Sequence, residues 1–352
     1  MKLDTLLIKW YLENKRDLPW RHTKDPYIIW VSEIILQQTR VIQGIDYFHR
    51  FVHAFPDIES LANADEDAVL KLWQGLGYYS RARNMHASAK QIMDLHGGIF
   101  PESHSEILKL KGIGTYTAAA IASFAFDQSF PVLDGNVFRF LARYFNIDIP
   151  INSPEGKKIF YETVSNCIDK QNPALFNQAI MEFGALQCKP VSPDCSICPL
   201  NQSCLARKKN TVDLLPVKIK NKVPKIRHFN YLLIQQGSFI YLKQRTDKDI
   251  WKNLYDFPLI ETTEKQDAQS LVQEPAWIDI LQKRKWSLDP NPVCMEHQLT
   301  HQSIKALFWR VHVLEKKELP IMRIAKDQLH TYPISRLLEK YLEKNSDGLL
   351  CI

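Results

Sequence analysis

Hydrophobic residues recur at helical spacing through the first part of the chain. This pattern predicts helices over residues 3–11, 30–41 and 154–182, with further helical segments over 41–90 interrupted by Pro56 and the Gly75–Gly77 turn. From residue 228 the pattern changes to short runs rich in β-branched and aromatic residues. These runs predict strands over 231–234, 239–242 and 304–314, a hairpin turn at 235–238, and a closing helix over 333–344 that begins at a proline. An all-helical part followed by a mixed α+β part is therefore expected.

A glycine turn separates two helical patterns near the middle of the helical part. Gly112-Ile113-Gly114 predicts a tight turn, since glycine adopts positive φ without a Cβ clash, and Thr115 is placed to cap a helix over 116–122. The arrangement is a helix–hairpin–helix. Its turn directs backbone N–H groups at a helix N-terminus towards an anion, for which a DNA phosphate is the expected partner.

Length, composition and charge narrow the class of protein. At 352 residues two domains are more probable than one, and 45% hydrophobic and 24% charged residues are ordinary for a globular protein. No apolar run reaches transmembrane length and residues 1–16 lack signal-peptide architecture, so we expect a cytoplasmic, nucleoid-associated protein with no membrane partner. A net charge of +6 permits nucleic-acid binding without requiring it.

Four of the seven cysteines are clustered. In a cytosolic chain, clustered thiols indicate a metal site rather than disulfides. Ligand chemistry alone leaves zinc and an iron–sulfur cluster both open. The four residues are Cys188, Cys195, Cys198 and Cys204.

Two carboxylates stand in apolar surroundings. Asp134 lies between Leu133 and Gly135, where the ordinary alternative is an N-cap of a helix over 136–144. Glu33 is the one acid among the apolar residues of 31–36, where burial would raise the pKa of its carboxyl towards neutrality. The alternative for Glu33 is a surface position in the first turn of a helix.

Other polar and aromatic side chains suit contact with DNA. Arg21 follows Trp20 on a loop, and Gln37 and Gln38 follow Glu33 by one turn, where they can bond base edges or enter a stack opened by a flipped nucleotide. Tyr78 follows a glycine turn and precedes two arginines, a combination that suits stacking on bases. Each has a common alternative as a packed or exposed structural residue.

These motifs resemble the helix–hairpin–helix DNA glycosylases of the endonuclease III superfamily. The hairpin LKGIGTYTA followed by VLDGNVFR carries the resemblance, in which the aspartate matching Asp134 is catalytic. Bifunctional members carry a lysine in the second hairpin helix, but this chain has Tyr116 in that region and no lysine from there to Lys157. The departure points to the MutY-type adenine glycosylase branch, which lacks that lysine.

The resemblance implies roles for further residues. SEIILQQT matches the motif with the catalytic glutamate, here Glu33, and LPWR implies a base-pocket contact for Arg21. Tyr116 would orient a carboxylate and the sugar, Asn136 would hold a water or Glu33, and Tyr78 would intercalate. The cysteine spacing is that of the superfamily's [4Fe–4S] site. The implied contacts to the adenine pocket and DNA are Arg21, Gln37, Gln38, Tyr78, Gly112, Ile113 and Gly114.

The C-terminal part resembles a Nudix fold from residue 251 onwards. The Nudix hydrolase signature with its Mg²⁺-binding carboxylates is absent, which excludes nucleotide hydrolysis. In MutY-type enzymes a loop with an aromatic residue, a serine and a histidine reads 8-oxoguanine. Here the loop is Leu299-Thr300-His301, which keeps the hydroxyl and the imidazole but loses the aromatic ring.

The expected protein is thus multidomain: an all-α helix–hairpin–helix glycosylase domain with an iron–sulfur cluster, followed by an α+β Nudix-like domain. The expected bounds are 1–206 for the catalytic domain (a six-helix subdomain at about 25–134, a cluster subdomain at 1–24 plus 135–206), 207–226 for a basic linker and 227–352 for lesion recognition. We expect a monomeric, monofunctional enzyme that acts on A·8-oxoguanine or A·G mispairs in double-stranded DNA. The alternatives are a bifunctional glycosylase/lyase, disfavoured by Tyr116, and a non-catalytic DNA-binding protein, disfavoured by the two carboxylates.

Overall fold

The computed structural model describes residues 2–219 and 223–345, which divide into two compact units. Unit 1 comprises residues 1–63 and 87–220 of the chain, and unit 2 comprises residues 64–86 and 221–352. Residues 64–86 therefore pack with the C-terminal part of the chain, although they lie within the helical part of the sequence. No helix of the described residues is long and apolar enough to span a bilayer.

The helical part consists of twelve α-helices and two short 3₁₀ turns among the described residues. Proline opens several of these helices, including α2, α10 and α11, since its fixed φ suits the first helical position. The bounds are α1 Leu3–Asn14, η1 Pro19–Arg21, α2 Pro26–Leu36, α3 Val41–Ala54, α4 Ile58–Asn63, α5 Glu66–Trp73, α6 Ser80–His96, α7 His104–Ile107, α8 Thr115–Phe126, α9 Gly135–Tyr144, α10 Pro154–Ser165, α11 Pro173–Leu186, α12 Leu205–Lys208 and η2 Val212–Leu214.

The predicted helices exist, but several of their ends were wrong. The helix predicted over 154–182 is two helices, α10 and α11, because Pro173 cannot continue a helix and starts a new one. The helix predicted over 30–41 runs instead from Pro26 to Leu36 and is followed by a turn. Thr115 is the first helical residue of α8 rather than its cap, and Gly114 occupies the N-cap without a side-chain hydrogen bond.

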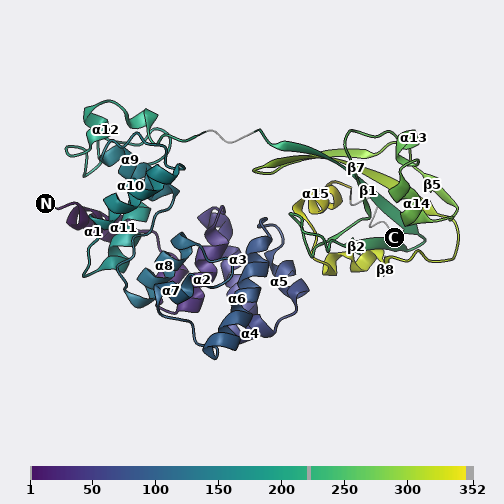
Figure 1. The fold of residues 1–352 in the computed structure, drawn as a ribbon, viewed down its shortest axis with the longest axis horizontal. Helices are drawn as coiled ribbons and strands as arrows, with labels where there is room; N and C mark the ends of the chain where they lie inside the picture. The colour runs from purple at the N-terminus through teal and green to yellow at the C-terminus, as the bar shows by residue number, and fades with distance from the viewer. Residues whose placement is uncertain (1, 220–222, 346–352) are drawn as a thin grey trace. The chain divides into compact units, whose positions relative to one another are not determined.

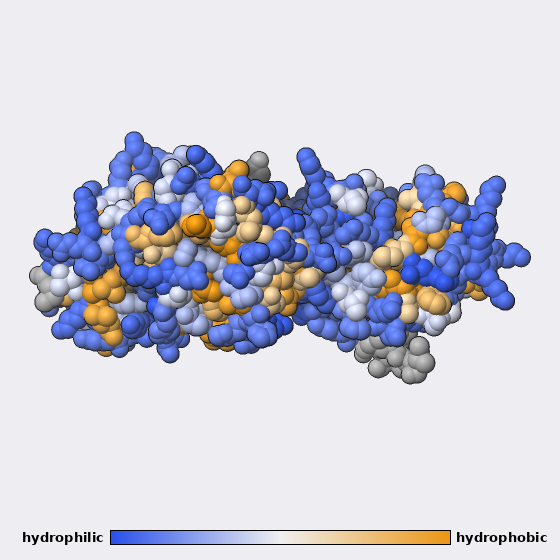
Figure 2. All heavy atoms as spheres, turned by 90° about the horizontal axis from the view of Figure 1, so that it is seen from below, coloured by the Kyte–Doolittle hydropathy of each residue, from blue (hydrophilic) through white to orange (hydrophobic). Residues whose placement is uncertain are grey.

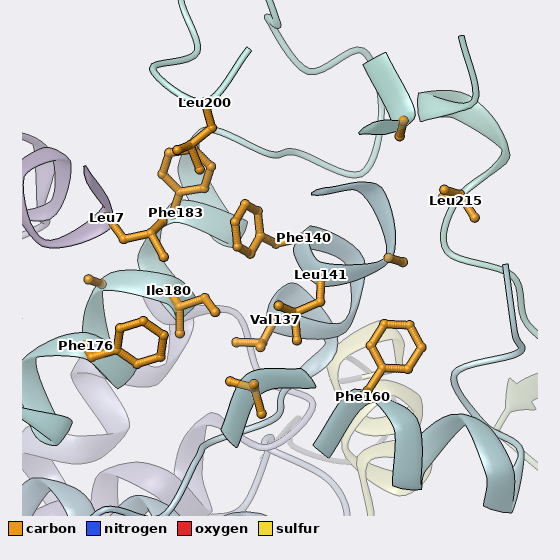
Figure 3. Packing of buried hydrophobic residues seen from close by; sticks show 14 of the residues in the cluster. Leu7, Val137, Phe140, Leu141, Phe160, Phe176, Ile180, Phe183, Leu200 and Leu215 are labelled. Atoms are coloured by element: carbon orange, nitrogen blue, oxygen red, sulfur yellow. The ribbon is translucent and has the colours of Figure 1, made fainter. Parts of the chain in front are cut away.

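A hydrophobic core joins α1, α9, α10 and α11 in unit 1 (Figure 3). Phe140 and Phe183 meet edge to face with ring centroids 5.2 Å apart, which joins α9 to α11. The labelled members of the cluster are Leu7, Val137, Phe140, Leu141, Phe160, Phe176, Ile180, Phe183, Leu200 and Leu215. This core holds the first turn of α9 against α11.

Unit 2 contains an eight-stranded mixed sheet with helices on both faces (Figure 1). Its two longest strands, β1 and β7, are parallel in the register Arg227↔Ile304, and the other pairings are antiparallel. The bounds are β1 Lys225–Gln236, β2 Phe239–Gln244, β3 Tyr255–Asp256, β4 Leu259–Thr262, α13 Ala268–Leu271, α14 Pro275–Leu281, β5 Trp286–Leu288, β6 Val293–Gln298, β7 Gln302–Val313, β8 Met322–Ala325, η3 Lys326–Thr331 and α15 Arg336–Lys344.

The two faces of this sheet are buried by different helices. On one face Trp309 packs in a cluster with Trp277 of α14, and on the other Phe308 stacks on Tyr341 of α15 with centroids 4.0 Å apart. Successive residues of β7 therefore face opposite layers, as strand geometry requires. The closing helix begins at Arg336, three residues later than predicted, because Ser335 is its N-cap and accepts a hydrogen bond from the backbone N–H of Leu338. The face drawn in Figure 2 carries separate hydrophobic patches among charged and polar residues.

Residues 64–86 are bonded to the C-terminal part at several points within unit 2. Tyr255 donates to Asp67 over 2.9 Å, Tyr79 donates to the carbonyl of Ile334 over 3.1 Å, and Arg83 donates to the carbonyl of Lys252 over 2.7 Å. These contacts explain why this segment belongs to unit 2.

Gly184 provides a stability prediction. A Cβ on this α11 residue would lie 2.6 Å from the backbone oxygen of Asn136, so Gly184→Ala should force α9 and α11 apart. We expect a loss of about 1–3 kcal/mol in the free energy of unfolding, measured by denaturant titration. Gly135→Ala is the matched control, since a Cβ there has no atom within 4 Å. Equal stability of the two variants would contradict the proposed close contact.

Candidate active site

One large cavity in unit 1, about 740 Å³ in volume, collects most of the residues singled out in the helical sequence. Its walls come from the segment after α1, from α2, from the hairpin and α8, from the start of α9 and from α11. The predicted site residues that line it are Arg21, Glu33, Gln37, Gln38, Gly112, Gly114, Tyr116, Asp134 and Asn136. Ile113 is not among the lining residues; it is 7% exposed and anchors the hairpin in the interior.

Glu33 lies on α2 with 7% of its surface exposed, and it faces the cavity. Its Oε2 accepts a hydrogen bond from the hydroxyl of Tyr116 over 2.9 Å. Burial raises the pKa of Glu33 to about 7, since the Tyr116 hydrogen bond opposes this effect only in part and the charge of Asp134 adds to it. Glu33 is therefore a carboxyl group that holds or releases a proton near neutral pH.

Asp134 is the N-cap of α9 and also lines the cavity. Its Oδ1 accepts from the backbone N–H groups of Asn136 and Val137 over 2.8 and 2.7 Å, and its Oδ2 accepts from Asn136 Nδ2 over 2.7 Å. Burial raises the pKa of Asp134 above its ordinary value, and these three hydrogen bonds offset that rise only in part. Capping and a chemical role are thus compatible in one side chain, because the bonds that cap the helix also stabilise the ionised carboxylate.

Sequence reasoning missed Glu182, which lies on α11 at the wall of the same cavity. It is 1% exposed and accepts hydrogen bonds from both Arg16 and Arg21, with Nη2–Oε2 distances of 2.6 and 2.8 Å. Burial raises the pKa of Glu182, but the hydrogen bonds from the two arginines outweigh it and lower the pKa to about 2. The available signal was one acid in the apolar run ALFNQAIMEFGAL, which resembles the setting of Glu33.

The hairpin offers backbone donors beside this cavity. Gly112 has φ of +79°, which allows the sharp turn, and Gly114 N-caps α8 without a side-chain bond. The first N–H groups of α8 have no intrahelical partner by position, and the helix dipole makes this end positive. The hairpin therefore has the features of an anion-binding turn.

The glutamine pair lies in the turn after α2 rather than on the helix. Gln37 Nε2 donates to Thr117 Oγ1 over 3.1 Å, which links the turn to α8. Gln38 is exposed and has φ of +57°, a left-handed conformation that turns the chain away from the axis of α2. Its side chain is presented at the edge of the cavity.

The four clustered cysteines line a second, apolar cavity together with Phe140, Phe183 and Leu200. Among the described residues, no group of His, Cys, Asp or Glu side chains is close enough to bind a single metal ion. Four thiols around one cavity are ligands that suit either zinc or an iron–sulfur cluster.

Two arginines of α9 connect the cysteine loop to the active-site end of that helix. Arg139 donates to the carbonyl of Cys188 over 2.8 Å and to Asn136 Oδ1 over 2.9 Å. Arg143 donates to the carbonyl of Lys189 over 2.6 Å. The position of Asp134 therefore depends on the conformation of the cysteine loop.

The remaining predicted residues lie in unit 2. Tyr78 is 51% exposed, has φ of +47°, and its hydroxyl is 2.7 Å from Thr300 Oγ1. Thr300 and His301 are exposed in the turn between β6 and β7, and Leu299 is partly buried there. The structure thus brings the proposed intercalating residue and the proposed reading loop together.

Comparison with known proteins agrees with this architecture. Residues 31–162 match the family model of the HhH-GPD superfamily base excision DNA repair proteins, and residues 230–344 match that of the NUDIX domain. The adenine DNA glycosylase of Buchnera aphidicola subsp. Schizaphis graminum is 37% identical over 318 residues, or 90% of this chain and 86% of that protein. That of Buchnera aphidicola subsp. Baizongia pistaciae is 39% identical over 272 residues, or 76% of each chain.

Solved structures resemble the helical part. A thermostable thymine-DNA glycosylase has a TM-score of 0.55 at 28% identity and covers 58% of this chain and 95% of its own. An endonuclease III in a non-covalent DNA complex has a TM-score of 0.52 at 20% identity, with 59% and 94% covered, which shows a shared fold. With the hairpin, the two-carboxylate cavity and the Nudix-like domain in place, this chain belongs to the adenine DNA glycosylases of the HhH-GPD superfamily.

Proposed function

We propose that the chain is a monofunctional glycosylase that removes adenine paired with 8-oxoguanine, or less efficiently with guanine, from double-stranded DNA. The observation that carries this proposal is the pair of carboxyl groups in one cavity. Burial raises the pKa of Glu33 to about 7, whereas three hydrogen bonds to Asp134 favour its ionised form and offset part of the rise in pKa that burial causes. Hydrolysis of a glycosidic bond needs one acid to protonate the leaving group and one carboxylate to stabilise the developing cation.

Adenine must leave the base stack before either group can reach it. In the cavity, Glu33 transfers its proton to N7 of adenine, and the C1′–N9 bond breaks with its electron pair moving to the base. Asp134 stabilises the positive charge that develops at C1′. Water then adds to C1′, its proton returns to Glu33, and the products are free adenine and an abasic site.

Tyr116 and Asn136 hydrogen-bond the two carboxyl groups and orient them. Tyr116 donates to Glu33 Oε2 and so leaves the other carboxyl oxygen to carry the proton. Asn136 holds Oδ2 of Asp134 through its side-chain amide and is placed to orient the attacking water. Since Tyr116 stands in the hairpin helix where bifunctional relatives have lysine, no amine is available there to form a Schiff base, and the enzyme is monofunctional.

The Arg21–Glu182 pair supplies a group that can read the base. Both oxygens of Glu182 accept hydrogen bonds from Arg16 and Arg21, so Glu182 fixes Arg21, whose guanidinium is the group that can donate to a ring nitrogen of adenine. Gln38 and Tyr78 would occupy the space left in the duplex. Gly112 and Gly114 would place hairpin N–H groups on a phosphate, with Ile113 buried beneath them.

Cys188, Cys195, Cys198 and Cys204 would hold a [4Fe–4S] cluster in the apolar cavity that they line. When bound, the cluster supplies a covalent cross-link of the loop. Arg139 and Arg143 donate hydrogen bonds from α9 to this loop. An ordered loop would therefore also restrain α9, whose N-cap is Asp134. The chemistry of base removal needs no electron transfer, so we assign the cluster a structural role.

Lesion recognition is assigned to the turn Leu299–His301 in unit 2. The extruded adenine is chemically normal, so the opposite base must be read elsewhere. 8-Oxoguanine differs from guanine by an N7 hydrogen and an O8 oxygen. The hydroxyl of Thr300 can accept from the first and the imidazole of His301 can donate to the second, while Leu299 offers only apolar contact. The proposed substrate is thus bound by a monomer through both units.

Glu33→Gln and Asp134→Asn should each nearly abolish adenine release while duplex binding is preserved. Glutamine keeps the size of Glu33 but cannot protonate N7 of adenine. Asparagine in place of Asp134 has no negative charge to stabilise the cation that develops at C1′. We expect a loss of about 10²–10⁴-fold or more in the single-turnover rate on an A·8-oxoguanine duplex, with the dissociation constant measured in parallel. A wild-type rate for Glu33→Gln would show that another group is the acid.

The single-turnover rate should depend on pH through both carboxyl groups. Glu33 must be protonated, so the rate should fall as pH rises above about 7, approaching tenfold per pH unit. Asp134 must be ionised, and since burial raises its pKa, the rate should also fall in the acidic range. The measurement uses saturating enzyme at fixed salt from pH 5 to about 9. A rate that stays constant above neutrality would contradict the assignment of Glu33.

Thr300→Ala combined with His301→Ala should reduce the preference for A·8-oxoguanine over A·G. Loss of one or two base contacts is worth roughly 1–3 kcal/mol, or about 5- to 150-fold in the ratio of single-turnover rates. Tyr78→Phe tests the Tyr78–Thr300 hydrogen bond separately, since it removes that bond but keeps both the ring and the Thr300 hydroxyl. An unchanged preference in the double variant would place lesion reading outside this turn.

A further inference from the structure

The turn between β6 and β7 is held at its base by backbone bonds. Leu299 N–H donates to the carbonyl of Gln302 over 2.8 Å, and Lys225 N–H of β1 donates to the carbonyl of His301 over 3.1 Å. The exposed side chains of Thr300 and His301 therefore project from a short, closed turn. Small changes at Gln302 would move both side chains.

Arg227 of β1 lies beside this turn and uses every N–H of its guanidinium. Nε and Nη2 donate to Glu261 over 2.7 and 2.6 Å, and Nη1 and Nη2 donate to Asp249 over 2.9 and 3.1 Å. The remaining donor, on Nη1, bonds Gln302 Oε1 over 2.9 Å. An arginine has five N–H donors in a fixed plane, so this arrangement is complete.

A second arginine, Arg245, helps to hold the Arg227 guanidinium in place. Arg245 pairs with Asp249 and also with Asp256, a carboxylate that is 1% exposed, over 3.2 Å. The ring of Phe229 lies under both guanidiniums, 4.7 Å from that of Arg227 and 5.8 Å from that of Arg245. Arg227 is only 14% exposed, so it has little freedom to choose another position.

We infer that Arg227 is a positioning residue for opposite-base discrimination, acting through its hydrogen bond to the side chain of Gln302. The inference rests on the proposed role of the Leu299–His301 turn as the reader. The ion network fixes Arg227, Arg227 fixes Gln302, and Gln302 closes the turn that presents Thr300 and His301. Lysine cannot substitute, since one ammonium lacks the planar fork that serves two carboxylates and an amide together.

The decisive pair of variants is Gln302→Leu and Gln302→Glu in the full-length protein. Leucine removes the acceptor at similar size, whereas glutamate keeps an acceptor for Arg227. The measured quantity is the ratio of single-turnover rates on A·8-oxoguanine and A·G duplexes at one salt concentration. Gln302→Leu should lower the ratio by about threefold to tenfold with the A·G rate unchanged, and Gln302→Glu should retain the ratio.

Arg227→Lys gives an independent measurement, with Arg323→Lys as its control. Arg323 also lies over an aromatic ring, Phe239, at 4.1 Å and pairs with Glu318 over 2.6 Å, but its partners lie away from the turn. Arg227→Lys should lower the ratio as Gln302→Leu does, and Arg323→Lys should leave it unchanged. Thermal unfolding of all four variants separates loss of position from loss of folding.

The outcomes distinguish this inference from the proposed function. If Thr300→Ala with His301→Ala lowers the ratio but neither Gln302→Leu nor Arg227→Lys does, the positioning role is wrong and the reader assignment stands. If Gln302→Glu lowers the ratio of rates as much as Gln302→Leu does, the proposed role of the Arg227–Gln302 hydrogen bond is also wrong. If the Thr300/His301 double variant keeps the wild-type ratio, the reader assignment itself fails.

Discussion

The start of α9 is the point on which the proposed active site depends. Asp134 accepts three hydrogen bonds there, two from backbone N–H groups of its own helix and one from Asn136. The helix is then fixed by close contact with Gly184 of α11, and Arg139 ties it to Gly184 and to the cysteine loop. Each of these contacts restrains the start of α9. The helix, rather than rigidity of the side chain itself, therefore holds the Asp134 carboxylate at a defined position.

Two buried acids of this cavity, Glu33 and Glu182, differ in pKa. Glu33 accepts a hydrogen bond from the Tyr116 hydroxyl, and burial raises its pKa to about 7. Glu182 is also buried, but hydrogen bonds from Arg16 and Arg21 lower its pKa to about 2. The number and charge of the neighbouring donors, rather than the residue type, therefore decide which acid can transfer a proton and which remains an anion. This separation allows acid chemistry and charge stabilisation in one cavity.

Unit 2 uses partly buried ion pairs for a different purpose. Arg227 and Arg245 share Asp249, and each has a further carboxylate partner, so two guanidiniums are paired with three carboxylates. Buried ion pairs add little to stability once desolvation is included, but they define geometry well. That property suits the support of an exposed recognition turn. The packing of residues 64–86 in the same unit also explains why Tyr78 lies beside Thr300.

The sequence by itself determined the family, the glycine hairpin, the two carboxylates, the cysteine cluster and the change from helical to strand periodicity, since each is encoded by residue types at short spacing. Only the tertiary structure decided the ends of α2, the separation of α10 and α11, the N-cap of α8, and the grouping of residues 64–86. It also placed Glu182 beside Arg21 and Gln302 beside Arg227, over separations of 161 and 75 residues. Burial and hydrogen-bond partners come from such distant segments, and for that reason no local pattern reveals which acid is protonated or which arginine positions a turn.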